Sequence, residues 1–152
     1  MMRHWKVYVA FIAATFLIGY TSALISPPGA WYEALEKPWF NPPNVIFPIA
    51  WTLLYILIAV AGAKAWIAGL MGLPFLFWVA QMGLNGLWSY IFFGLHSPFW
   101  ALIELLVLFA TIIGFIVTTW RFARSAALLF LPYAGWVAFA GVLNAAIWSL
   151  NS

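Results

Sequence analysis

Aromatic and amide side chains recur at helical spacing in an otherwise apolar chain. Trp51 and Tyr55 are four residues apart, and Asn85 is followed by Trp88 and Phe92. At this spacing each set lies along one side of a helix. Flat rings accompanied by a few amide or hydroxyl groups suit a large planar apolar ligand, because the rings stack on it and the polar groups orient it.

Conventional catalytic and metal-binding patterns cannot be identified. The chain has no cysteine, which excludes disulfides and thiolate metal sites. His4 and His96 have no partner ligands at metal-binding spacing, so we predict no metal site. No nucleophile with an adjacent base and no phosphate-binding loop is evident. We therefore expect neither hydrolysis nor phosphoryl transfer, and no required cofactor.

The elements that position the aromatic residues are predicted to be membrane-spanning helices. Of the 152 residues 67% are hydrophobic and 6% are charged, whereas a soluble domain carries roughly a quarter charged residues. Five continuously apolar stretches approach the roughly 20 residues that a helix needs to cross a bilayer. They are residues 7–25, 45–66, 73–95, 99–120 and 126–150. We predict an all-α integral membrane bundle of five transmembrane helices, forming a single domain over residues 1–152.

The connection between the first two stretches is long and stiff. Residues 26–44 contain five prolines and four aromatic residues, so we expect a structured lid on the bundle or a segment in the membrane interface. A short helix is expected within residues 31–37. Ser97 and Pro98 are typical of an N-cap and first helical residue, and Pro132 predicts a kink in the fifth helix.

Charge predicts the orientation. Five of the six basic residues fall on the side of the N-terminus, and Lys37 falls on the other. The positive-inside rule then places the N-terminus in the cytoplasm of a bacterial cell. The alternative interpretation of the first stretch is a secretory signal, because Arg3 and Lys6 precede it, but the stretch is long for one. The basic residues are too few and scattered for nucleic-acid binding.

Depths estimated from a rise of about 1.5 Å per residue place the aromatic and amide residues in one layer of the outer half of the membrane. The residues of this layer are Trp51, Tyr55, Asn85, Trp88, Ser89, Phe92, Trp136, Ala140 and Asn144. The layer is either a ligand pocket or a packed core, and Gln81 and Asn85 could equally hold helices together. Amides in hydrocarbon are costly without partners, which favours the pocket.

Glu104 is the acidic residue that falls within a predicted span. An intramembrane carboxylate is a candidate proton site or counter-charge. The alternative is a structural role, because Glu104 lies about 9 Å from the outer helix end, where its side chain can reach the interface or a neighbouring helix.

Longer motifs resemble a known family. They include residues 31–43 (WYEALEKPWFNPP), 47–55, 81–94, 100–106 and 131–148. In this order, over the whole chain, they resemble the tryptophan-rich sensory protein or translocator protein family (TspO/MBR), formerly the peripheral benzodiazepine receptors. The resemblance implies a five-helix bundle, commonly a homodimer. It also implies binding of porphyrins such as protoporphyrin IX, and of isoquinolines and benzodiazepines, in a pocket beneath the first loop.

The resemblance also assigns roles to residues. Ligand-binding positions of the family fall here on Tyr32, Trp51, Tyr55, Asn85, Trp88, Phe92, Trp136 and Ala140. Positions implicated in light-dependent porphyrin breakdown fall on Trp51 and Trp136, and Glu104 stands where relatives often have aspartate. Ala145 and Ser149 occupy places where animal members have a tyrosine and a basic residue, so cholesterol binding by that route is doubtful.

Three functions follow as hypotheses. The first is a membrane receptor or sensor that binds, and in one version transports, porphyrins and other planar aromatic molecules. The second is a light-dependent porphyrin-degrading enzyme that uses Trp51 and Trp136. The third is a proton-coupled small-molecule transporter that uses Glu104. The sequence does not choose among them, nor does it identify the physiological ligand or the dimer interface.

Overall fold

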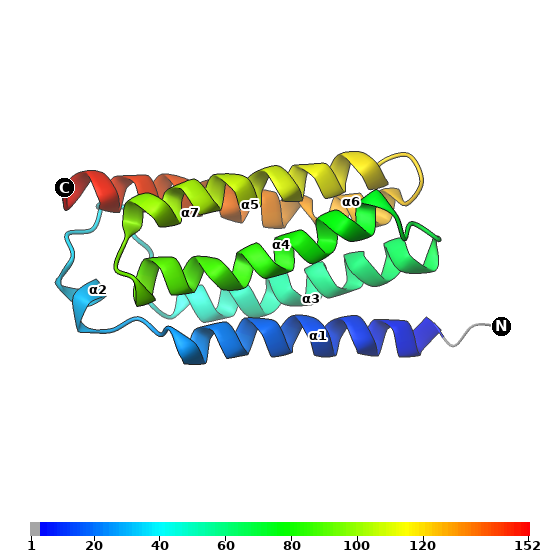
Figure 1. The fold of residues 1–152 in the computed structure, drawn as a ribbon, viewed down its shortest axis with the longest axis horizontal. Coiled ribbons are helices and arrows are strands. Elements are labelled where there is room, and N and C mark those ends of the chain that lie inside the picture. Colours follow the sequence, from blue (N-terminus) through cyan, green and yellow to red (C-terminus); the bar gives the residue numbers. More distant parts are fainter. Residues whose placement is uncertain (1–3) are drawn as a thin grey trace.

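The computed structural model describes residues 4–152, which form a bundle of helices without a strand among them (Figure 1). The helices are α1 (His4–Ile25), α2 (Ala30–Ala34), α3 (Ile46–Ile67), α4 (Leu73–Ser89), α5 (Pro98–Thr119), α6 (Arg124–Leu129) and α7 (Leu131–Leu150), and the π-helical segment η1 (Tyr90–Gly94) continues α4. The all-α prediction is confirmed. Within residues 4–152, four segments are long and apolar enough to cross a membrane, namely α1, α3, α5 and the segment Arg124–Leu150.

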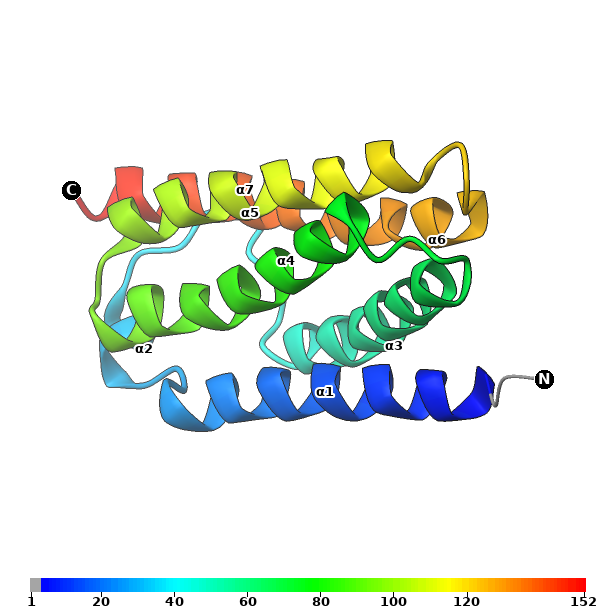
Figure 2. The same ribbon diagram turned by 45° about the vertical axis from the view of Figure 1, so that its right-hand side comes forward.

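The long helices pack side by side along the bundle. Helix α1 packs against α3 and α4, and α5 packs against α4 and α7. Figure 2 shows α4 crossing the bundle obliquely between α1 and α5. The short helix α2 lies at the end of the bundle where α1 and α7 end, and α1 begins at the opposite end (Figure 1).

Two glycines allow α1 and α3 to approach their neighbours closely. A Cβ atom at Gly19 of α1 would lie 2.5 Å from Cζ of Tyr55 on α3, and one at Gly62 of α3 would lie 2.6 Å from Nε1 of Trp78 on α4. The Trp78 indole N–H donates to the carbonyl oxygen of Ile58 at 2.9 Å. The position of the Tyr55 ring therefore depends on the missing side chain at residue 19.

The start of α5 agrees with the prediction made from Ser97 and Pro98. The predicted fifth helix differs from the structure near Pro132. The hydroxyl oxygen of Ser97 accepts a hydrogen bond from the backbone N–H of Trp100 at 3.3 Å, and Pro98 begins α5, so the predicted cap is confirmed. The predicted fifth helix is instead divided, because α6 ends at Leu129 and Pro132 lies in the first turn of α7. Proline has no N–H and crowds the preceding turn, so the expected kink becomes an interruption at Phe130.

The connection between α1 and α3 contains α2 and is fastened at two places. The Nζ of Lys37 donates to the carbonyl oxygens of Tyr32 at 2.8 Å and of Leu35 at 3.3 Å, which caps the C-terminal end of α2. The backbone N–H of Glu36 donates to Oδ1 of Asn151 at 3.0 Å, and Nδ2 of Asn151 donates to the carbonyl oxygen of Glu36 at 2.8 Å. These bonds anchor the connection to the C-terminal end of α7.

The contact between Gly19 and Tyr55 can be tested by adding one methyl group. We expect Gly19→Ala to destabilise the protein by about 1–3 kcal/mol, because the methyl group displaces the Tyr55 ring from a packed interface. The measurement is the melting temperature in detergent, followed by tryptophan fluorescence. The control is Gly83→Ala in α4, where nothing lies within 4 Å of the added Cβ. Equal melting temperatures for the two variants would contradict the close approach.

Candidate functional site

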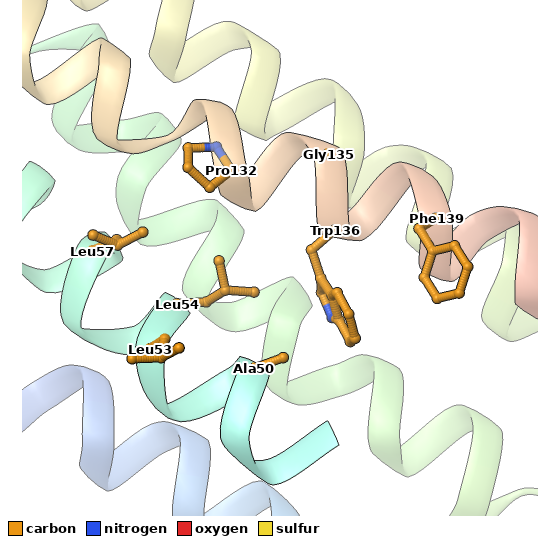
Figure 3. A pocket seen from close by; sticks show the side chains of 8 residues that line it. All are labelled: Ala50, Leu53, Leu54, Leu57, Pro132, Gly135, Trp136 and Phe139. Atoms are coloured by element: carbon orange, nitrogen blue, oxygen red, sulfur yellow. The ribbon is translucent and has the colours of Figure 1, made fainter. Parts of the chain in front are cut away.

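A groove of about 470 Å³ lies between α3 and α7 (Figure 3). The residues that line it are Ala50, Leu53, Leu54 and Leu57 of α3 and Pro132, Gly135, Trp136 and Phe139 of α7. Its volume is within the roughly 300–1,000 Å³ that is usual for ligand pockets. No lining side chain is charged, and the Trp136 ring extends from α7 toward α3 (Figure 3). The groove is therefore suited to an apolar ligand.

Four rings behind the groove form the α3–α7 cluster, defined as Trp51, Tyr55, Tyr133 and Trp136. The ring centroid of Trp51 lies 5.6 Å from that of Tyr55 and 6.3 Å from that of Tyr133. Trp51 and Trp136 meet edge to face, at 6.4 Å and 85°. The structure thus brings together three predicted ligand residues, and Trp136 connects them to the groove.

Other predicted residues form a second group, the α2–η1 cluster, defined as Tyr32, Trp88 and Phe92. The rings of Trp88 and Phe92 are stacked, with centroids 4.9 Å apart and an interplanar angle of 23°. Tyr32 covers Phe92 edge to face at 6.1 Å. Phe92 is 1% exposed and Tyr32 is 8% exposed. Trp88 packs against both hydrophobic cores of the bundle.

The phenol of Tyr32 lies outside the long helices and is buried. Burial raises its pKa above the usual value. A phenol is protonated at neutral pH even at its ordinary pKa, and burial acts further in that direction. Tyr32 can therefore present a hydrogen-bond donor beneath the connection.

Tyr133 is the centre of a buried hydrogen-bonded chain between α4 and α7. Its hydroxyl accepts from Nδ2 of Asn85 at 2.9 Å and donates to Oε1 of Gln81 at 2.8 Å. Gln81 and Tyr133 are fully buried, and Asn85 is 8% exposed. The interpretation of Gln81 and Asn85 as residues that hold helices together is confirmed. A ligand-binding role for Asn85 stays a prediction.

Asn144 makes a second polar link, at the outer end of the predicted layer. Its Oδ1 accepts from the indole N–H of Trp88 at 3.0 Å, and its Nδ2 donates to the carbonyl oxygen of Pro98 at 2.8 Å. The side chain therefore connects α4, α5 and α7 and holds the Trp88 ring in place. Asn144 is 2% exposed, so a direct contact with a ligand would require a rearrangement.

The remaining predicted residues occupy different places. Ala140 packs at the edge of the larger hydrophobic core, and Ser89 is half-buried at the last position of α4. Glu104 of α5 is 8% exposed, and neither carboxylate oxygen has a hydrogen-bond partner among residues 4–152. Its role as a proton site stays a prediction. Among the same residues, no group of three or more His, Asp or Glu could hold a metal ion.

Sequence reasoning missed the central position of Tyr133. The signal was available, because Tyr133 precedes Trp136 by three residues and therefore shares its side of the helix. A tyrosine in a membrane span also needs a hydrogen-bond partner, and Gln81 and Asn85 in another predicted span can supply one.

Comparison with known proteins shows the family to which the chain belongs. Residues 10–149 match the TspO/MBR family. The chain belongs to the TspO/MBR family. It is therefore a multi-pass integral membrane protein, consistent with its apolar helices. The resemblance inferred from the motifs is confirmed.

Named relatives of the TspO/MBR family are similar over most of the chain. The Tryptophan-rich protein TspO of Archaeoglobus fulgidus is 40% identical over 95% of this chain and 96% of its own length. The Tryptophan-rich sensory protein of Cereibacter sphaeroides is 35% identical over 99% of this chain and 95% of its own. The human Translocator protein is 31% identical over 80% of this chain and 75% of its own.

The hydrogen-bonded chain through Tyr133 predicts the effect of removing one oxygen atom. We expect Tyr133→Phe to lower stability by about 1–2 kcal/mol, because Gln81 and Asn85 lose their shared partner inside the membrane. The measurement is the melting temperature in detergent. Tyr20→Phe is the matched control, because the Tyr20 side chain is 54% exposed. If both variants melt at the wild-type temperature, the hydrogen bonds of the Tyr133 hydroxyl do not hold α4 to α7.

Proposed function

We propose that the protein is a membrane receptor or sensor that binds porphyrins, such as protoporphyrin IX, and other planar aromatic molecules. The observation that carries the proposal is the contact of Trp51 with Trp136, whose ring lines the groove between α3 and α7. Perpendicular rings at the edge of an apolar groove offer one face for stacking and one edge for lateral contact with a flat ligand. Family membership supports the same class of ligand.

Access to the α2–η1 cluster requires movement of the connection. Trp88 and Phe92 are stacked on each other, and Tyr32 of α2 covers Phe92. A ligand that contacts the rings of both clusters would therefore have to displace α2. In that state Tyr32 and Asn85 would orient the polar edge of the porphyrin while the rings stack on its faces. The connection between α1 and α3 acts as a lid in this proposal.

Five membrane crossings are part of the proposal. Helix α4 has 17 residues and η1 adds 5, and together they are long enough to cross about 30 Å of hydrocarbon. This segment would be the third crossing, between α3 and α5. The basic residues at the N-terminal end of the bundle, among them Lys6, Lys64 and Arg124, would then face the cytoplasm. Arg3, which contributed to that count, lies outside the described residues.

Several assignments stay predictions within this proposal. They are the homodimer, the bacterial cell membrane as location, and the transport of the bound porphyrin across it. The single-domain organisation over residues 1–152 is a further one. Sterol binding through the fifth membrane segment stays doubtful for the reason given at Ala145 and Ser149.

Porphyrin binding can be measured through tryptophan fluorescence. Protoporphyrin IX is expected to quench the fluorescence of the purified protein. Trp51→Ala and Trp136→Ala should each weaken binding at least about tenfold, which corresponds to loss of about 1.4 kcal/mol of stacking. Trp120→Ala, at the other end of the bundle, is the control and should leave the dissociation constant unchanged. Wild-type dissociation constants in both site variants would remove the assignment of the site.

A second candidate function is the light-dependent oxidative breakdown of the bound porphyrin. It is favoured by three oxidisable rings, because Trp51 contacts both Trp136 and Tyr133, and Trp136 lines the groove. In this version dissolved dioxygen is the oxidant that opens the illuminated porphyrin ring and supplies the oxygen atoms of the product, and the two tryptophans receive or relay oxidising equivalents during the reaction.

Illumination of the complex distinguishes this activity from simple binding. We expect absorbance spectra to show a new bilin-like product with the wild-type protein. Trp51→Phe and Trp136→Phe keep an aromatic ring for stacking but are harder to oxidise, so they should bind porphyrin and form less product. Bleaching at the rate of free porphyrin in the wild type would reject the enzyme and leave the receptor proposal intact.

A further inference from the structure

A second groove, of about 350 Å³, lies at the opposite end of the bundle from α2. Lys6, Val7, Ala10 and Phe11 of α1 line it together with Trp66 of α3 and Phe75 of α4. The α1 residues are spaced i, i+1, i+4 and i+5 and so lie along one side of that helix. The groove shares no residue with the porphyrin site proposed above.

The walls of this groove are apolar and aromatic. The Trp66 ring contacts Phe75 at 5.1 Å and Phe11 at 6.4 Å between centroids. Phe11 also packs edge to face on the buried Trp78 at 4.9 Å. Because these rings hold one another, the floor of the groove is part of the packed bundle. The groove therefore persists as a surface against which an acyl chain can lie.

Among the described residues that line this groove, the one charged group is the cation of Lys6. The Lys6 side chain is exposed, with Nζ 5.7 Å from the centroid of the Trp5 ring. The three acidic residues of the chain are Glu33, Glu36 and Glu104, on or beside α2 and on α5, so none lies on a helix that lines the groove. Lys64, Arg121 and Arg124 lie at the same end of the bundle and add positive potential.

We propose that this groove binds one anionic phospholipid of the surrounding bilayer. The acyl chain lies along Val7, Ala10 and Phe11 against the rings of Trp66 and Phe75, and the phosphate is paired with the ammonium of Lys6. A cation beside an apolar trough at the end of membrane helices matches an amphiphile with a negative head and an apolar tail. The basic end of a membrane protein normally faces the leaflet that is rich in anionic lipid.

The proposal is tested by native mass spectrometry of the protein in detergent with added lipid. The probes are phosphatidylglycerol and phosphatidylcholine with identical acyl chains. Wild-type protein is expected to retain one phosphatidylglycerol per chain, about fivefold more than phosphatidylcholine, which is the preference that one cation gives at a membrane surface. Lys6→Gln should abolish the preference, and Lys6→Arg should keep it.

Two further variants separate a defined site from general attraction. Lys64→Gln removes the same charge from the same end of the bundle but does not touch the groove, and it should keep the preference. Ala10→Phe fills the groove and should reduce retention of both lipids. Melting temperatures check that each variant is folded.

Three outcomes would overturn the proposal. They are an equal loss of preference in Lys6→Gln and Lys64→Gln, unchanged retention in Ala10→Phe, and displacement of the phospholipid by protoporphyrin IX. The last would make the porphyrin the occupant of this groove. None of these results depends on Trp51 or Trp136, so the lipid site and the porphyrin site can fail separately.

Discussion

A polar atom inside a bilayer has no water to bond, so its partner must come from the bundle itself. The Tyr133 hydroxyl satisfies this constraint by accepting from Asn85 and donating to Gln81, both on α4. Because this one hydroxyl bonds to two residues that are one turn apart on α4, it restricts the rotation of α7 about its own axis. It also fixes the position of α7 along the length of α4. Trp136 lies three residues further along α7, and its direction toward α3 follows from that rotation. The groove and the α3–α7 cluster therefore depend on this buried pair of bonds.

The two aromatic clusters differ in how much freedom their rings have. Trp88 is held by Asn144 and stacked on Phe92, whereas Trp136 borders an open groove. A flat molecule that arrives from the bilayer can reach Trp136 without disturbing the core. Contact with Phe92 requires α2 to move first. In the proposed function, binding therefore proceeds in two steps, with an early contact at α7 and a later one beneath the connection.

Much of the fold could be predicted from the sequence, because bilayer thickness sets the length of an apolar helix and lipid excludes open strands. The cap at Ser97 followed from local chemistry in the same way. The groove could not be predicted, because spacing shows which residues share one side of a helix and not which neighbour that side meets. That choice depends on close approaches such as Gly19 against Tyr55. The division of the predicted fifth helix at Phe130 depends on how strongly Pro132 distorts the preceding turn. A sequence pattern does not give the size of that distortion.

The fastening of the connection to α7 has a consequence for how the chain can change during evolution. Asn151 bonds the N–H and the carbonyl oxygen of residue 36, and both belong to the main chain. The side chain at position 36 is therefore free to drift among nineteen amino acids, and proline is excluded because it lacks the N–H. Position 151 has no such freedom, since a side-chain amide supplies a donor and an acceptor at once. Selection that keeps the connection between α1 and α3 closed would therefore act on position 151. That position is near the C-terminus and far in sequence from the connection itself.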